Sequence, residues 1–161
     1  AGWVLEAEIL AHKGQPYEAH HLFSEVCKRE PKHPTACGGA VSTIVASQRS
    51  ADAFAYLRSQ YPRMREHPGT AHHYWVSKAK VHQQMGDVPE AIISARRALG
   101  FRRDDRAALQ LLIRLHIELG DSDAAQSAMN RLAIKMKGEK TDAQYVELAR
   151  AVTEMTRRLT R

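Results

Sequence analysis

Histidine and cysteine side chains can bind metal ions or act in catalysis, and this chain has nine His and two Cys. Four of the His form adjacent pairs, His20-His21 and His72-His73. Neighbouring helix residues point about 100° apart, so the members of a pair do not converge on one metal ion. We therefore predict that the His residues are partly exposed helix residues, with no metal site and no catalytic role.

The two cysteines, Cys27 and Cys37, are too few for a disulfide framework and do not form the paired motif of a metal site. We favour buried, reduced cysteines that act as small apolar residues. The alternative is a disulfide bond, since the two residues would lie on neighbouring helices. The sequence leaves this alternative open.

Signatures of catalysis are absent from the 161 residues. The chain has no Gly-rich phosphate-binding loop, no nucleophile elbow, no His-Glu-x-x-His and no paired Cys motif. This absence favours a protein that is not an enzyme and that uses no cofactor.

The composition indicates a helical globular protein with 43% hydrophobic and 6% aromatic residues. No apolar run approaches the roughly 20 residues of a membrane span, so no membrane insertion is expected. The net charge of +6 favours acidic partners. The chain opens at Ala1 without Met or a visible signal peptide, so we expect a fragment of a longer soluble protein, cytoplasmic or periplasmic, whose targeting segment could have been removed.

One short phrase recurs along the chain and predicts helical hairpins. Its clear copies are Lys13–Ala19, Met85–Ala91 and Leu119–Ala125, and a copy without Gly is Gln48–Ala53. The Gly of each clear copy is expected to end a helix in the left-handed conformation, and the polar residue after it to cap the next helix.

The alanines that close these phrases are regularly spaced. Ala19 and Ala53 are 34 residues apart, Ala53 and Ala91 are 38 apart, and Ala91 and Ala125 are again 34 apart. We assign the four additional residues to 61–69, which is rich in Pro and charge. An elongated loop or an overlong second helix is expected there.

This period and the residue pattern resemble those of the tetratricopeptide repeat family. The positions of the first copy that match the family pattern are Trp3, Gly14, Tyr17, Ala19, Phe23 and Pro31. The Leu-Gly pair usual in the first helix is absent, and the closing Pro is missing from the third and fourth copies. The resemblance implies an all-α fold, a right-handed superhelix (solenoid) of four hairpins with a C-terminal capping helix.

We expect a single domain over 1–161, with repeats at about 1–33, 34–69, 70–103 and 104–138 and a capping helix at about 141–160. Thr141 is predicted to cap that helix together with Gln144, which lies three residues later. Its apolar residues would then cover the exposed face of the last hairpin.

In this family the first helix of each hairpin lines the concave wall, so the resemblance implies that a partner binds there. The residues that share this face are Val4, Glu8, His12, Gly38, Ser42, Val45, His73, Val76, Lys80, Gln83, Gln84, Gln110, Arg114, Ile117 and Arg150. Apolar side chains of a partner would contact Val4, Val45 and Val76. Each of the adjacent glycines Gly38 and Gly39 destabilises a helix by about 1 kcal/mol relative to Ala, so we expect a compensating role. They would allow a close backbone approach or make room for a bulky group of a partner.

One column of equivalent groove positions turns basic along the chain, from Glu8 to Lys80, Arg114 and Arg150. We therefore expect a protein or peptide partner with acidic groups. The alternative is that each Arg pairs with the Glu four residues later on its own helix, Glu118 or Glu154.

The leading functional hypothesis is a non-catalytic scaffold or adaptor that binds a peptide or protein segment. The main alternative is a regulatory or substrate-presenting repeat domain of a larger enzyme or of a polysaccharide-synthesis or secretion complex. Nucleic-acid binding is disfavoured, because Phe101 is the single Phe, Tyr or Trp in the basic stretch Arg96–Lys140, too few to stack successive bases. Binding of chaperone tails, which uses Asn in this family, is disfavoured because Asn130 is the sole Asn and lies in a second helix. The oligomeric state is left open.

Overall fold

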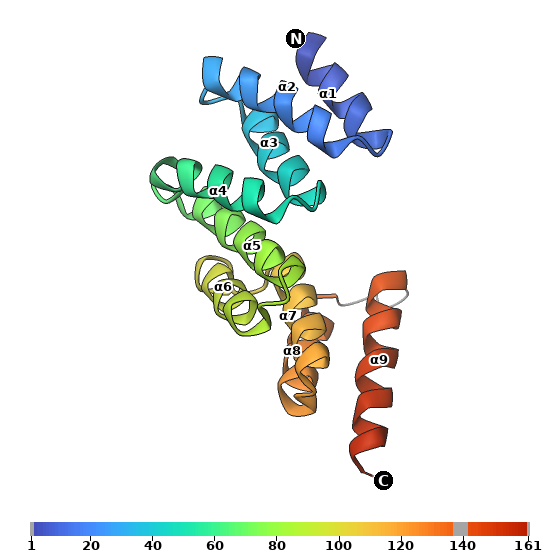
Figure 1. Ribbon diagram of the computed structural model, residues 1–161. Helices are drawn as coiled ribbons and strands as arrows, with labels where there is room; N and C mark the ends of the chain where they lie inside the picture. The colour runs from blue at the N-terminus through green and yellow to red at the C-terminus, as the bar shows by residue number, and fades with distance from the viewer. Residues whose placement is uncertain (1, 137–141, 161) are drawn as a thin grey trace. The chain divides into compact units, whose positions relative to one another are not determined.

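A computed structural model describes residues 2–136 and 142–160, and these residues form nine α-helices and no strand (Figure 1). The helices are α1 (Gly2–His12), α2 (Pro16–Arg29), α3 (Pro34–Ala46), α4 (Ser50–Met64), α5 (Pro68–Gln84), α6 (Val88–Phe101), α7 (Arg106–Leu119), α8 (Ser122–Lys135) and α9 (Ala143–Leu159). The predicted all-α fold is confirmed.

The helices belong to two compact units, Ala1–Arg63 and Met64–Arg161. In the first unit α2 packs against both α1 and α3. In the second unit α5, α6, α7 and α8 each pack against the next helix, and α9 packs against α7 and α8. Leu148 and Val152 of α9 are buried, as expected for a helix that covers the last hairpin.

The turns between paired helices have the backbone conformation that the sequence predicted. Gly14, Gly86 and Gly120 have φ of 76°, 77° and 77°. After each Gly, the next amide donates a hydrogen bond of 2.9–3.0 Å to the carbonyl five residues earlier, which ends the helix. Gln48, in the copy that lacks Gly, adopts the same left-handed region with φ 56°.

The four regularly spaced alanines are fully buried. Each has an exposed fraction of 0%, and they are Ala19, Ala53, Ala91 and Ala125. A methyl group allows two helix backbones to approach, and any larger side chain would have to displace the neighbouring helix. The spacing of these residues therefore reports a repeated packing contact.

The four additional residues form neither a long loop nor an overlong second helix, so that prediction was wrong. Instead α5 begins at Pro68, seven residues before Trp75, whereas α7 begins only three residues before the equivalent Leu109. The insertion therefore adds one turn to the start of α5. Pro68 suits this place, because the first residue of a helix needs no amide donor.

Asp142 caps α9, and Thr141, the predicted cap, lies outside the described residues. The Asp142 carboxylate accepts hydrogen bonds from the backbone amides of Gln144 and Tyr145 at 3.0 and 3.2 Å. Arg106, the first residue of α7, lies 2.9 Å from the same carboxylate. Hydrogen bonding from Arg106 lowers the pKa of Asp142, so this ion pair joins the starts of α7 and α9.

Candidate functional site

The predicted groove positions of the second unit are brought together on α5, α7 and α9. The Gln83 Nε2 of α5 donates a hydrogen bond to Glu118 Oε1 of α7 at 3.0 Å. Gln110 Nε2 of α7 donates to Gln144 Oε1 of α9 at 3.2 Å. Since α7 packs against both other helices, these contacts join the three into one surface, which we call the α5–α7–α9 surface.

Three cations lie on these helices at equivalent positions, Lys80 on α5, Arg114 on α7 and Arg150 on α9. All three side chains are exposed, and none forms an ion pair with another residue in the described part of the chain. Arg150 also lines a shallow hollow along α9. Their charges are therefore open to an external anion.

The carboxylates that could have neutralised these cations are engaged elsewhere. Glu118 accepts its hydrogen bond from Gln83, and Glu154 pairs with Arg158. The alternative that Arg114 and Arg150 pair with the Glu four residues later does not hold in the structure.

The valines expected to contact a partner's apolar side chains are less accessible than predicted. Val76 is 6% exposed and Val45 is 5% exposed, so both belong to the core. Ile117 is half-buried and Val146 is 42% exposed, and these two offer the apolar contact area of the α5–α7–α9 surface instead.

His73 and the two Gln residues complete the predicted positions of the second unit. His73 and Gln84 are exposed, while Gln83 is half-buried. Partial burial lowers the pKa of His73, and the positive charges of Arg102 and Lys80 act in the same direction. These effects disfavour a positive charge on His73.

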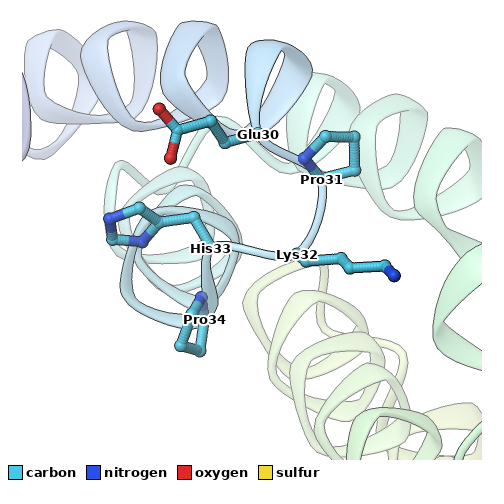
Figure 2. A pocket seen from close by; sticks show the side chains of 5 residues that line it. All are labelled: Glu30, Pro31, Lys32, His33 and Pro34. Carbon is cyan, nitrogen blue, oxygen red and sulfur yellow. The ribbon is translucent and has the colours of Figure 1, made fainter.

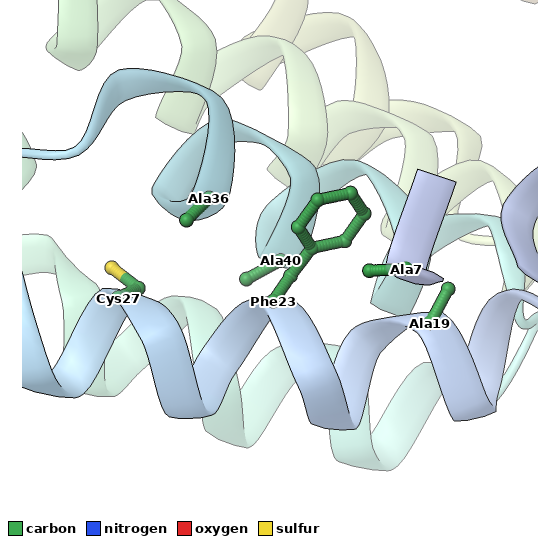
Figure 3. Packing of buried hydrophobic residues seen from close by; sticks show 6 residues of the cluster. All are labelled: Ala7, Ala19, Phe23, Cys27, Ala36 and Ala40. Atoms are coloured by element: carbon green, nitrogen blue, oxygen red, sulfur yellow. The ribbon is translucent and has the colours of Figure 1, made fainter. Parts of the chain in front are cut away.

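The remaining predicted positions lie in the first unit, on α1 and α3. Figure 3 shows the apolar cluster of the first unit, which contains Ala7 and Phe23. Val4 is partly buried against this cluster. The others are Glu8, which is half-buried, and the exposed residues His12, Gly38 and Ser42. They belong to the first unit, so they are described apart from the α5–α7–α9 surface of the second unit.

Cys27 and Cys37 form a disulfide bond, with their Cα atoms 4.9 Å apart, and the prediction of reduced cysteines was wrong. The bond closes the turn between α2 and α3. Figure 2 shows five side chains of this turn around a hollow, those of Glu30, Pro31, Lys32, His33 and Pro34. The two prolines between the cysteines were the sequence signal for a tight reversal that brings the cysteines together.

The prediction that the His residues are partly exposed was wrong for four of them. The buried residues are His20, His72, His82 and His116. His82 and His116 occupy the same place in successive hairpins, 3.5 and 3.8 Å from the carboxylates of the capping residues Asp87 and Asp121. The buried His therefore serve as packing and turn residues of the helical hairpins.

Buried His makes the fold sensitive to acid. Burial lowers the pKa of His116, against the opposing effect of Asp121, and also lowers the pKa of His20, whose Nδ1 lies 2.8 Å from the Ala40 carbonyl. Unfolded His has a pKa of about 6.5, so below that pH the unfolded chain binds more protons than the folded chain. The contribution of the neutral, buried His116 and His20 to the free energy of unfolding is fully present above about pH 6.5. It is lost as the pH falls toward their lower folded-state pKa values.

We expect the thermal midpoint to fall between about pH 7.5 and about pH 5.5, measured by circular dichroism in buffers of equal ionic strength. His116→Phe, which cannot titrate, should flatten this dependence. His12→Phe, at an exposed position, is the matched control and should leave the slope unchanged. An equally steep fall in the His116→Phe variant would contradict the assignment.

Within the described residues, no group of three His, Cys, Asp or Glu side chains is placed to hold a metal ion. None of the described helices is long and apolar enough to cross a membrane. Comparison of the chain with protein-family models and with curated proteins finds no match.

Proposed function

We propose that this chain is a non-catalytic interaction module, and that the α5–α7–α9 surface binds an acidic segment of a partner protein. The observation that carries the proposal is the row formed by Lys80, Arg114 and Arg150. These side chains are exposed and lack carboxylate partners in the described part of the chain, while Glu118 and Glu154 are occupied. Three open cations on three packed helices suit a carboxylate-rich segment that crosses those helices.

The apolar part of the surface suggests what accompanies the acidic groups. Ile117 and Val146 lie on α7 and α9, the helices that carry Arg114 and Arg150. A segment with apolar residues between its Asp and Glu residues would bury this area, at about 25 cal/mol per Å² removed from water. We therefore propose a mixed acidic and apolar segment rather than a purely acidic one.

We further propose that the paired helices are tetratricopeptide-type repeats, four hairpins in a right-handed superhelix closed by α9. Support comes from the recurring left-handed Gly after the first helix and from the fully buried Ala five residues later. Two of the three intervals between these alanines are 34 residues long, which is the period of that repeat.

The test uses fluorescent peptides that alternate Asp or Glu with Leu, and matched peptides with Lys in place of the acidic residues. We expect the acidic peptide to bind, and the double reversal Lys80→Glu with Arg114→Glu to weaken binding by at least about tenfold, since attraction becomes repulsion at two sites. Affinity should also fall as salt is added.

The matched control is Arg96→Glu with Lys135→Glu, which makes the same change in net charge on exposed positions of α6 and α8. This control should retain most of the affinity. Equal losses of affinity in both double variants would show that net charge alone explains the effect. An unchanged affinity in the Lys80→Glu with Arg114→Glu variant would refute the proposed surface.

A further inference from the structure

A guanidinium group lies against both sulfurs of the disulfide. Arg63 Nη1 is 3.2 Å from Cys27 Sγ and 3.3 Å from Cys37 Sγ. The same nitrogen donates to the Pro31 carbonyl at 3.0 Å, and Nη2 donates to Gln60 Oε1 at 2.8 Å. The guanidinium is thus fixed in place by two neutral acceptors.

The positive charge of Arg63 is not neutralised locally. Arg63 forms no ion pair with a carboxylate in the described part of the chain. Lys28, the residue after Cys27, is itself paired with Glu25 at 2.7 Å. A structural disulfide gains little from such a charge, whereas a thiolate gains a great deal, because a cation at this distance lowers a thiol pKa.

The two sulfurs differ in access. Cys27 is 4% exposed and lies in the last turn of α2, in the apolar cluster of the first unit. Cys37 is half-buried and lies in the first turns of α3, where the positive end of the helix dipole also favours a thiolate. Cys37 is therefore the more accessible of the two cysteines to an incoming reagent.

We propose that Cys27–Cys37 is a thiol–disulfide exchange site that reacts with a dithiol. A thiolate of the dithiol attacks Cys37 Sγ and forms a mixed disulfide, while the Cys27–Cys37 bond breaks and Cys27 leaves as a thiolate beside Arg63. The second thiolate of the dithiol then attacks the other sulfur of the dithiol, which is bonded to Cys37 Sγ in the mixed disulfide. Cys37 is released as a thiolate that takes a proton from water, and the dithiol leaves as an internal disulfide, oxidised by two electrons.

The first test measures the rate at which dithiothreitol reduces the folded protein, with the two released thiols counted by a chromogenic reagent. We expect Arg63→Gln to be reduced about three- to tenfold more slowly than the wild type, because the leaving thiolate loses its cation. Arg58→Gln, an exposed Arg on the same helix, is the matched control and should react at the wild-type rate.

The direction of this effect separates chemistry from structure. If Arg63 only braced the turn through Pro31, its loss would loosen the turn and make reduction faster. A rate equal to or above that of the wild type in Arg63→Gln would therefore overturn the proposal. Thermal midpoints of the oxidised variants, recorded in parallel, show that each variant is folded.

The second test asks which sulfur reacts. In the variant Cys27→Ser only Cys37 remains, and in Cys37→Ser only Cys27 remains. With oxidised glutathione we expect the first variant to form a mixed disulfide at least about tenfold faster than the second, as mass spectrometry would show. Faster modification of Cys27 would refute the assignment of Cys37 as the attacked sulfur.

Discussion

Removal of the disulfide by the double substitution Cys27→Ala with Cys37→Ser is expected to lower the free energy of unfolding of the first unit by about 3 kcal/mol. The two cysteines are 10 residues apart, so the bond restricts a short loop of the unfolded chain. Loop-closure entropy for this length gives the estimate. Ala at position 27 avoids burying a hydroxyl group where Cys27 is 4% exposed.

Urea unfolding of the oxidised wild type, the reduced wild type and the double variant measures this effect. The reduced wild type and the double variant should lose similar stability, because both lack the cross-link. Amide hydrogen exchange should accelerate in α2 and α3, and the amides of α7 and α8 in the second unit should keep their protection. A loss below about 1 kcal/mol would contradict the prediction and would mean that the reduced, unfolded chain already keeps this short loop partly closed.

Gly39→Ala is expected to destabilise the first unit by about 1–3 kcal/mol, and Gly38→Ala to stabilise it by about 0.5–1 kcal/mol. A Cβ atom at Gly39 would lie 2.8 Å from Cζ of the Phe23 ring, closer than two carbons can approach. Phe23 is 3% exposed in the core of the unit, so the ring has little room to move (Figure 3). A Cβ at Gly38 meets no atom within 4 Å, so Ala there gains only its higher helix propensity.

The two glycine variants form a matched pair, because each adds one methyl group to neighbouring positions of α3. Thermal and urea unfolding should shift in opposite directions for the two. Replacement of the Phe23 ring by a smaller side chain tests the cause. The double variant Phe23→Leu with Gly39→Ala should lose less free energy of unfolding than the sum of the losses of the two single variants. Equal effects of Gly38→Ala and Gly39→Ala would contradict the close contact with Phe23.

These contacts also decide between the two roles expected for Gly38 and Gly39. Gly39 serves a close approach inside the protein, by Phe23 of α2, and Gly38 is the exposed member of the pair. Only Gly38 is therefore left to accommodate a partner group.

Local features of the fold were predictable, because their causes lie within a few residues. Gly14 takes a positive φ since the turn needs it there, and the alanine that follows at Ala19 is fully buried. The starts of helices were less predictable. An elongated loop or an overlong second helix was expected around Pro68, whereas the structure shows that Pro68 begins α5.

The candidate surface could be predicted in part. The equivalence of Lys80, Arg114 and Arg150 follows from the repeat period. That these cations lack carboxylate partners does not follow, because Glu118 is engaged by Gln83, a residue 35 positions away in the sequence. The burial of Val76 was missed for the same reason, since a helix pattern does not tell which neighbouring helix covers a side chain.

The sequence by itself determined the helical hairpins, their period and the positions of their turns, because left-handed Gly, capping residues and small packing residues act locally. The tertiary structure alone decided the state of Cys27 and Cys37 and the place of Arg63 beside them. The disulfide joins two helices whose cysteines are 10 residues apart, and Arg63 lies 36 and 26 residues from Cys27 and Cys37 in the chain. A disulfide forms only where two sulfurs meet, and a charge acts strongly only within a few ångströms, so both depend on how the helices pack.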